Sequence, residues 1–427
     1  MHFFKHKFMI NSSSAWSRRR FINTLTGAGT ALALSPLVAW TIADIDPRVA
    51  KIIANTIGVD THNHIDVPLT AAEAPGPDID LAGELKKSGL SAICMTFALD
   101  YQRLDKAGEA YERFLNGLAV MDQQLAKNNM KRALNMADLT RAYKNHQPTV
   151  IQSIEGGHFL EGQLDRLAIA YSRGLRHLTL LHDSDASTPL GDVYTNPPKF
   201  GGLTPFGKDV IKECNRLGIL VDMAHAGTET LTAALKMAAH PVIISHTGLD
   251  TQLGQNPNMA RMMKPRLISK ENAKMVADAG GIIGVWTHLA DSALEYAQNI
   301  KALVDVVGMD HVCIGTDTKL TPLYRPPGNG FGPKPGEQGP PPGNRPNDNG
   351  GDRHDGRPPG DNGNNGPGGQ NRRPGERTNE AWEGQETGFY YAVADAMLKV
   401  GFTPGEIGKM AGGNFCRVFD AATTGRG

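Results

Sequence analysis

Histidines and acidic residues follow one short apolar run after another along this chain. Each run is rich in Val, Ile and Leu and leads into a residue type that can bind a divalent metal ion. These residues are His62, His64, Glu155, His182, His225, His246 and Asp317. Neutral imidazoles and carboxylates together suit Zn²⁺ or a similar ion that keeps an open position for a reactive water. The set predicts a hydrolase that works with two divalent metal ions.

The apolar runs predict the strands that hold these residues in place. Eight runs are near-continuous in apolar residues, as expected for strands that are buried on both faces of a parallel sheet. They cover residues 57–60, 92–97, 149–154, 177–181, 219–224, 242–245, 282–286 and 312–316. Helix-like segments lie between them, at residues 81–88, 111–127, 205–217, 228–239 and 270–279. The alternation predicts an α/β fold, a (β/α)8 TIM barrel. A doubly wound open sheet is the alternative, although it does not by itself explain ligands at so many strand ends.

A barrel would bring the seven candidate residues together. Catalytic groups of a (β/α)8 enzyme lie at the carboxyl ends of the strands, so all seven should meet at one mouth. Glu155 is the candidate bridge between two metals, because it is a single acid followed by Gly156 and Gly157, which let the backbone pass close to the ions.

The remaining histidines near the runs divide by position. His158 and His288 follow strand ends, so they are candidates for lining the pocket. His177, His240 and His311 are expected at strand beginnings, the end of a barrel that serves stability, where a structural role is the simpler interpretation.

Composition excludes several classes of function. The chain of 427 residues has 44 Lys plus Arg and 44 Asp plus Glu, so nothing indicates nucleic-acid binding. Its four cysteines are far apart and form no C-x-x-C pair, which excludes a zinc ribbon or a redox motif. Cys94 and Cys313 fall inside apolar runs and are expected to be small buried residues.

Residues 1–43 are expected to be an export signal rather than part of the fold. Arg18, Arg19 and Arg20 precede an uncharged stretch at 21–43 that is rich in Ala, Gly, Thr and Leu. This pattern is typical of a twin-arginine signal, which predicts the twin-arginine export machinery as a partner and a periplasmic or cell-envelope location. An uncleaved membrane anchor is the alternative, since the stretch is about long enough to span a bilayer. Residues 44–427 would form a single barrel domain.

A Pro-, Gly- and Asn-rich segment at about 322–378 interrupts this domain. Such a composition cannot bury enough apolar area to offset its ordering entropy, so the sequence predicts a disordered insert after the eighth strand, beside the mouth. An inert surface insertion is the simpler interpretation. A lid or a tether to the cell envelope is the alternative. Residues 388–400 and 403–419 are predicted to form two closing helices.

Several stretches together resemble the membrane (renal-type) dipeptidase family of zinc peptidases, over most of residues 57–419 except the insert. They are Asp60-Thr61-His62-Asn63, Ile154-Glu155-Gly156-Gly157-His158, Leu175-Arg176-His177-Leu178-Thr179-Leu180-Leu181-His182, Leu203-Thr204-Pro205-Phe206-Gly207, Leu220-Val221-Asp222-Met223-Ala224-His225, Pro241-Val242-Ile243-Ile244-Ser245-His246, Gly308-Met309-Asp310-His311-Val312 with Ile314-Gly315-Thr316-Asp317, and Gly412-Gly413-Asn414-Phe415-Cys416-Arg417-Val418-Phe419. The resemblance implies a dipeptidase whose activated hydroxide attacks the scissile carbonyl.

The resemblance also implies a role for each residue. His62 would bind the first zinc, Glu155 would bridge the two, and His225 and His246 would bind the second. His182 would donate to the carbonyl oxygen as charge develops on it.

Two further roles concern the substrate. Asp317 would orient the substrate amine or transfer a proton to the leaving amine. An arginine after the sixth strand binds the terminal carboxylate in this family, a bidentate task suited to guanidinium. Arg266 is the candidate here, with Arg261 as the alternative.

The sequence departs from the family pattern in two places. The family has His-x-Asp after the first strand, whereas this chain has His62-Asn63-His64, the pattern of the wider amidohydrolase superfamily. The change makes His64 a candidate ligand, removes one negative charge from the metal cluster and is expected to draw Asp317 toward the first zinc. The second departure is the loop after His246, where only the arginine of the family's Arg-Asn-x-x-Asp stretch is kept.

These observations predict an exported, zinc-dependent dipeptidase that cleaves an amide bond next to a free carboxylate. One alternative is an amidohydrolase acting on N-acyl amino acids or other non-peptide amides. A third hypothesis is a non-catalytic envelope protein that uses the barrel for partner binding. The expected partners are a small-molecule amide substrate and the export machinery, and a homodimer is left open.

Overall fold

The computed structural model describes residues 45–424, apart from residues 75, 102, 103, 105, 323 and 325–375. The predicted export signal and most of the predicted insert lie outside the described residues. No helix within the described residues is long and apolar enough to cross a membrane.

The described chain forms one sheet of nine parallel strands in the order β8-β7-β6-β5-β4-β3-β2-β1-β9. The strands are β1 (Val59–His64), β2 (Ala92–Thr96), β3 (Thr149–Glu155), β4 (Leu175–Thr179), β5 (Leu220–Asp222), β6 (Ile243–Thr247), β7 (Ile282–Val285), β8 (Val312–Ile314) and β9 (Thr318–Lys319). Each of the eight predicted runs overlaps a strand, and nearly every strand residue is buried.

The eighth strand closes the barrel in two pieces. β8 pairs with β7, and after a break of three residues β9 pairs with β1, Asn63 opposite Thr318. Within the break, the Asp317 backbone N–H donates to the His62 carbonyl at 3.1 Å. The predicted (β/α)8 TIM barrel is therefore confirmed, with its last strand broken at the residue predicted to act in catalysis.

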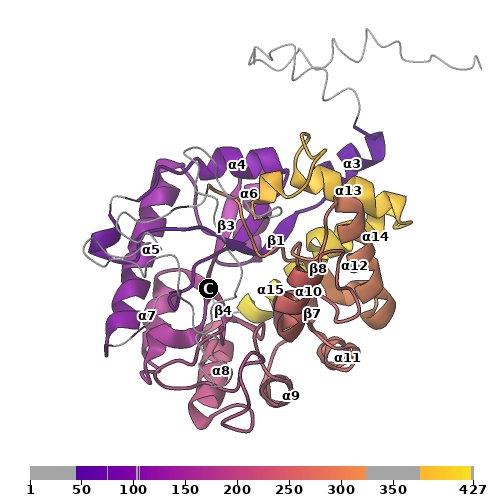
Figure 1. Ribbon diagram of the computed structural model, residues 1–427. Coiled ribbons are helices and arrows are strands. Elements are labelled where there is room, and N and C mark those ends of the chain that lie inside the picture. Colours follow the sequence, from indigo (N-terminus) through magenta and orange to yellow (C-terminus); the bar gives the residue numbers. More distant parts are fainter. Residues whose placement is uncertain are drawn as a thin grey trace, which may run out of the picture. The chain divides into compact units, whose positions relative to one another are not determined.

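Helices surround the barrel (Figure 1). They are α3 (Pro47–Asn55), α4 (Leu81–Ser88), α5 (Glu109–Lys127), α6 (Met136–Lys144), α7 (Arg166–Ser172), α8 (Pro205–Leu217), α9 (Thr228–Met237), α10 (Pro257–Met263), α11 (Lys270–Asp278), α12 (Ala293–Val307), α13 (Phe389–Lys399), α14 (Pro404–Gly408) and α15 (Asn414–Thr423). Local chemistry sets their ends. In α8, the Thr204 hydroxyl accepts from the Gly207 N–H, Pro205 occupies the first turn, and Gly218 ends the helix with φ 88°.

One predicted helix is wrong in detail. Residues 403–419 do not form a continuous helix but α14, a wider turn at Lys409–Gly413, and then α15. The cause is a close approach of two backbone segments. A Cβ added at Gly412 would lie 1.8 Å from the carbonyl oxygen of Ile57, so the chain can pass β1 only where there is no side chain.

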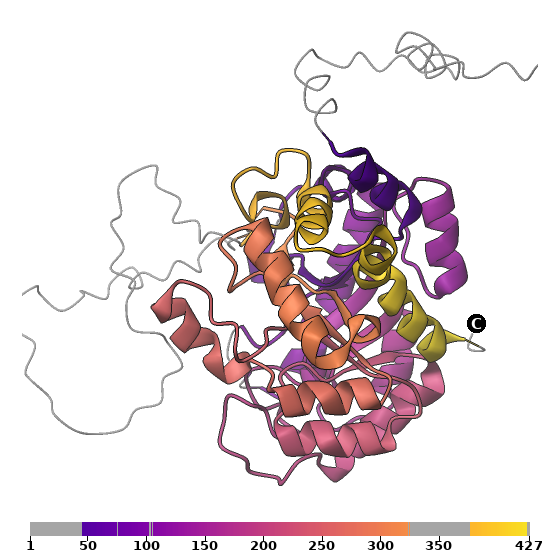
Figure 2. The same ribbon diagram turned by 90° about the vertical axis from the view of Figure 1, so that its right-hand side faces the viewer.

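The turn directs α15 across the amino-terminal end of the barrel. Phe415, Val418 and Phe419 of α15 pack on residues at the beginnings of the strands in one apolar cluster. Those strand residues are Val59, Ala92, Cys94, Ile151, Leu220, Ile243, Ile282 and Cys313. Figure 2 shows α15 (yellow) at the right-hand side of the barrel. The helix closes that end, and Cys94 and Cys313 are buried there as expected.

The two chain segments that flank the insert lie side by side. The Lys319 N–H donates to the Glu376 carbonyl at 2.9 Å, and the Thr318 and Thr378 hydroxyls are 2.6 Å apart. The packed structure therefore includes the last residues of the predicted insert, because Thr378 is fully buried and its hydroxyl contacts β9. Both flanks join β9 next to the carboxyl end of β1.

Candidate metal centre

The carboxylate of Glu155 lies at the centre of a ring of histidines. Its Oε1 is 2.9 Å from Nε2 of His225, 3.4 Å from Nε2 of His62 and 3.5 Å from Nε2 of His246. Its Oε2 is 3.3 Å from Nε2 of His182 and 3.5 Å from Nε2 of His64. Five imidazoles from four strands and the loops after them thus face one buried carboxylate.

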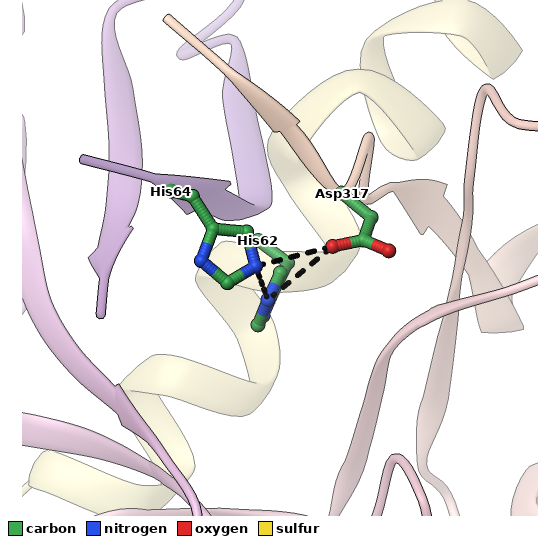
Figure 3. A group of neighbouring side chains, drawn as sticks. All are labelled: His62, His64 and Asp317. Atoms are coloured by element: carbon green, nitrogen blue, oxygen red, sulfur yellow. Dashed lines mark hydrogen bonds and ion pairs between the residues drawn. The ribbon is translucent and has the colours of Figure 1, made fainter. Parts of the chain in front are cut away.

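Asp317 completes one side of this ring. Its Oδ1 is 3.2 Å from Nε2 of His64 and 3.8 Å from Nε2 of His62, and these two ring nitrogens are 3.2 Å apart. Figure 3 shows the three side chains pointing toward one another. His62 and His64 both lie on β1, so the His-x-His spacing places both rings at one position, and Asp317 reaches it from the break in the eighth strand.

His225 and His246 form the other side. Their Nε2 atoms are 3.0 Å apart, and both lie within 3.5 Å of Glu155 Oε1. His246 is on β6, whereas His225 stands three residues beyond the end of β5, with a left-handed backbone at φ 66°. Asp317 also has a positive φ, 55°. Such conformations are uncommon for residues other than glycine. Here they accompany the contacts of His225 with Glu155 and of Asp317 with the two histidines of β1.

The geometry fits divalent cations. Two pairs of ring nitrogens face each other at 3.0 and 3.2 Å, and two carboxylates lie among them. Three groups of three could each hold an ion: His62, His64 and Asp317; His62, Glu155 and His246; Glu155, His182 and His225. Glu155 belongs to two of these groups, which suits the bridging position predicted for it.

The surroundings shift the pKa values of the two histidines His225 and His246 in opposite directions. Burial alone would lower the pKa of His225, but hydrogen bonds to Asp183 and Glu155 raise it to about 10. Burial lowers the pKa of His246 to about 3, and the neighbouring charge of His62 adds to the shift. Burial opposes ionisation of Glu155 and Asp317, yet the surrounding histidines hold the pKa of both carboxyl groups well below its usual range.

His182 is held by a hydrogen bond to a different carboxylate, that of Asp100. Its Nδ1 is 2.5 Å from Oδ1 of Asp100, and Oδ2 of Asp100 accepts from the Ser184 hydroxyl at 2.6 Å. Because an ionised carboxylate only accepts hydrogen bonds, His182 carries a proton on Nδ1 toward Asp100. Burial by itself raises the pKa of Asp100, but the hydrogen bond from His182 lowers it to about 2. The other ring nitrogen of His182 is left to face Glu155 and the mouth of the barrel.

Arg266, and not Arg261, reaches the site. The Arg266 guanidinium forms an ion pair with Asp183, whose other oxygen is 3.1 Å from Nδ1 of His225. The Tyr194 hydroxyl is 3.0 Å from the same nitrogen. Arg261 lies exposed on α10. The arginine proposed to bind a carboxylate is thereby joined to a candidate metal ligand through a single aspartate.

The remaining histidines occupy different positions. His288 Nε2 lies 2.8 Å from Asp317 Oδ2, and His158 Nε2 lies 3.1 Å from the carbonyl of Ser184, behind His182. His311 bonds to the Gly281 carbonyl, away from the ring of histidines. His177 departs from its predicted position, since β4 begins two residues earlier than expected, where Leu175 pairs with Gln152. Its ring is buried 3.4 Å from Asp222.

The sequence interpretation missed the residues that contact the histidines from behind. Four of them contact a ring nitrogen directly, namely Asp100, Asp183, Tyr194 and Ser245, and the fifth, Asp222, accepts from the Ser245 hydroxyl. Two signals were available. Asp100 follows the second apolar run, the one early run to which no polar residue was assigned, and Asp183 directly follows His182. Asp222 and Ser245 lie within strands, where the pattern of apolar runs gives no indication of function.

The model of one protein family, described as membrane dipeptidase (peptidase family M19), matches residues 47–323 of the 427. The chain belongs to this family. Members of the membrane dipeptidase family are metal-dependent peptidases, so this chain is a dipeptidase-like metal-dependent hydrolase. The match includes all of the candidate ligands.

Solved structures share the fold of this membrane dipeptidase family member. An amidohydrolase from Pseudomonas aeruginosa is 18% identical with a TM-score of 0.63, over 88% of this chain and 98% of that one. The probable dipeptidase PvdM from the same organism is 15% identical with a TM-score of 0.62, over 88% and 99%. A metallopeptidase from Rhodobacter sphaeroides, liganded with a phosphinate mimic of the dipeptide L-Ala-D-Ala, is 16% identical with a TM-score of 0.58, over 86% and 100%.

Proposed function

We propose that the protein is an exported dipeptidase that uses two divalent metal ions, most suitably Zn²⁺, to cleave an amide bond next to a free carboxylate. The observation that carries this proposal is the position of Glu155, whose two oxygens lie within 3.5 Å of Nε2 of five histidines. His62, His64 and Asp317 would hold one ion, His225 and His246 the other, and Glu155 both. Bound there, the ions would polarise the scissile carbonyl and activate water.

Three residues of the chain would stabilise the developing charge, transfer the proton and bind the substrate. His182, held by Asp100, would donate from Nε2 to the oxygen of the scissile carbonyl as negative charge develops on it. Asp317, whose Oδ2 lies 2.8 Å from Nε2 of His288, would pass a proton to the leaving amine. Arg266 would bind the substrate carboxylate and so select short peptides with a free carboxyl end.

Export through the twin-arginine machinery is part of the proposal. The arginines at 18–20 and the weakly apolar stretch after them support it. The machinery carries folded proteins, which would allow the metals to be acquired before export. Detection of the full-length protein in a periplasmic fraction, and its loss from that fraction when Arg18, Arg19 and Arg20 are replaced by lysine, would test this part.

A specific observation favours a second candidate, the hydrolysis of N-acyl amino acids. A free dipeptide carries an ammonium group that needs a carboxylate partner. Asp100 and Asp183, which contact His182 and His225 from behind, are already engaged by those histidines and by Ser184 and Arg266. His64 also stands where the family has a carboxylate. Both features suit a substrate whose amino group is acylated and uncharged.

One substrate screen separates the two candidates. Zinc-loaded protein is assayed on L,L-, L,D- and D,D-dipeptides and on the matching N-acetyl amino acids, with His64→Asp as the comparison variant. Faster turnover of dipeptides supports the main proposal, and faster turnover of acyl amino acids supports the second. A gain of dipeptide activity in His64→Asp would show that this ligand sets the preference. Absence of turnover on every compound of the panel would overturn both.

A further inference from the structure

The hydroxyl of Ser245 lies beneath both sides of the candidate metal centre. Its Oγ is 2.9 Å from Nδ1 of His246 and 3.3 Å from Nδ1 of His62. It is also 2.6 Å from Oδ2 of Asp222. Ser245, Asp222 and His62 are fully buried and His246 is 3% exposed, so water does not compete for these contacts. His62 belongs to the side with His64, and His246 to the side with His225, so one oxygen atom contacts a ligand from each.

The direction of these hydrogen bonds follows from Asp222. Its Oδ1 accepts from the backbone N–H groups of Ala224 and Ser245, both at 2.9 Å, and its Oδ2 accepts from the Thr179 hydroxyl at 2.5 Å. A carboxylate surrounded by donors is an acceptor only, so the Ser245 hydroxyl must give its single proton to Asp222. The Ser245 oxygen then has only lone pairs left for the two imidazoles, and each must donate to it from Nδ1.

This fixes the tautomer of both rings. An imidazole that donates from Nδ1 and is otherwise neutral has its lone pair on Nε2, the form that binds a metal ion. The Nε2 atoms of His62 and His246 are the ones that face Glu155, at 3.4 and 3.5 Å. Asp222 and Ser245 therefore orient two lone pairs toward the same carboxylate.

The backbone of Ser245 is held as tightly as its side chain. Its carbonyl accepts from the Thr61 hydroxyl at 2.7 Å. A Cβ added at Gly284 or at Gly315 would lie 1.9 or 1.8 Å from the same carbonyl oxygen, so only glycine fits beside it. Strands β1, β6 and β7 and the end of β8 meet at this point, which gives the hydroxyl a fixed position.

We propose that the Asp222–Ser245 pair is a shared positioning device that prepares one histidine of each metal site for binding. The proposal rests on the proposed function, in that it assumes two metal ions around Glu155. The proposal predicts that loss of this one hydroxyl lowers the affinity for both metal ions together. His225 offers the contrast, since its Nδ1 is held separately by Asp183 and Tyr194.

The experiment is zinc titration of the full-length, chelator-stripped protein by calorimetry, for wild type, Ser245→Ala and Tyr194→Phe. The two variants are matched, because each removes a single hydroxyl next to Nδ1 of a candidate ligand. Loss of such a partner lowers metal affinity by about 10–100-fold. Ser245→Ala is expected to weaken both binding events by that factor, and Tyr194→Phe to weaken only one. Circular dichroism and the melting temperature of each metal-free protein serve as controls for folding.

The outcomes are separable. Wild-type affinity for both zinc ions in Ser245→Ala, or a loss confined to one ion, would overturn the shared role. Wild-type protein that binds fewer than two zinc ions would overturn the proposed function, and this inference with it. If Ser245→Ala does not fold, Ser245→Cys replaces it. A thiol is a weak donor and acceptor, so both affinities should fall by a smaller factor, and unchanged affinities would again overturn the inference.

Discussion

The two ends of this barrel are built from the same strands but have different roles, since one holds an apolar core and the other the candidate metal centre. At the amino-terminal end, Val59, Ile243 and other apolar residues at the strand beginnings pack against Phe415 and Phe419 of α15. At the carboxyl end, the same strands or the loops after them supply imidazoles and carboxylates that face one another at 2.9–3.8 Å. Buried apolar contacts lower the free energy of the folded state. Buried polar and charged groups raise it unless they are hydrogen-bonded, paired or bound to a metal ion. Mutations at one end should therefore change stability and mutations at the other should change chemistry, and four experiments test this expectation.

The largest effect is expected for Glu155→Gln at the carboxyl end. An amide cannot supply the negative charge that two cations share, so metal content should fall below two ions per chain. Metal ions contribute several kcal/mol of transition-state stabilisation, and at about 1.4 kcal/mol per factor of ten the loss in kcat/KM should be about a thousandfold or more. Metal analysis and steady-state kinetics on the best substrate measure both. Loss of the fold in Glu155→Gln, as judged by circular dichroism of the metal-free protein, would contradict the separation of stability from chemistry.

Phe415→Ala is the matching change at the amino-terminal end. Phe415 is fully buried, and its ring stacks on Phe419 with centroids 5.5 Å apart. Removal of a buried phenylalanine costs about 3–5 kcal/mol of unfolding free energy. Denaturant unfolding should show this loss, while the folded variant keeps the wild-type number of metal ions and the wild-type KM. Loss of a metal ion from the folded variant would mean that the two ends are coupled.

Arg266→Lys separates substrate binding from metal binding within the carboxyl end. An ammonium group cannot form the paired hydrogen bonds of a guanidinium with a carboxylate. Hydrogen bonds to charged groups contribute about 1.5–3 kcal/mol, so KM for substrates with a free carboxylate should rise about 10–100-fold. A substrate whose carboxyl end is amidated is the control, and its kcat/KM should be the same in both proteins. Equal KM values for the carboxylate substrate would exclude Arg266 as its binding residue.

The smallest effect is expected for Asp122→Asn near the amino-terminal end. Burial opposes ionisation of Asp122, but hydrogen bonds from Arg132 and Arg173 hold its pKa below the usual value. A carboxyl group with a lowered pKa stabilises the fold above the pKa of the unfolded chain, about 3.9, and loses that contribution as pH falls below it. The Asp122 side chain is 42% exposed, so at pH 7 the cost should be about 1 kcal/mol or less. Denaturant unfolding at pH 7 and pH 3 measures it, and an equal difference at both pH values would contradict the assignment.

The sequence was most informative where one residue type decides one local feature. Each apolar run overlaps a strand, and α4 and α8 have the predicted bounds because an N-terminal cap and a following glycine define their ends. The residue types after the runs were enough to predict which side chains meet. The sequence was least informative where two segments distant in the chain meet, as at Gly412, whose contact with Ile57 breaks the predicted last helix.

The amino-acid sequence was sufficient to predict the barrel, the seven residues around one mouth and the family. Periodicity and residue type are local properties, and strand ends of a parallel barrel converge whatever the loops do. The contacts that hold those residues in place became visible only in the folded structure. It broke the eighth strand at Asp317, gave His225 a left-handed backbone, joined Arg266 to His225 through Asp183, and put Ser245 beneath two ligands at once. Those features depend on distances between residues that are far apart in the chain, and such distances are fixed only when the core packs.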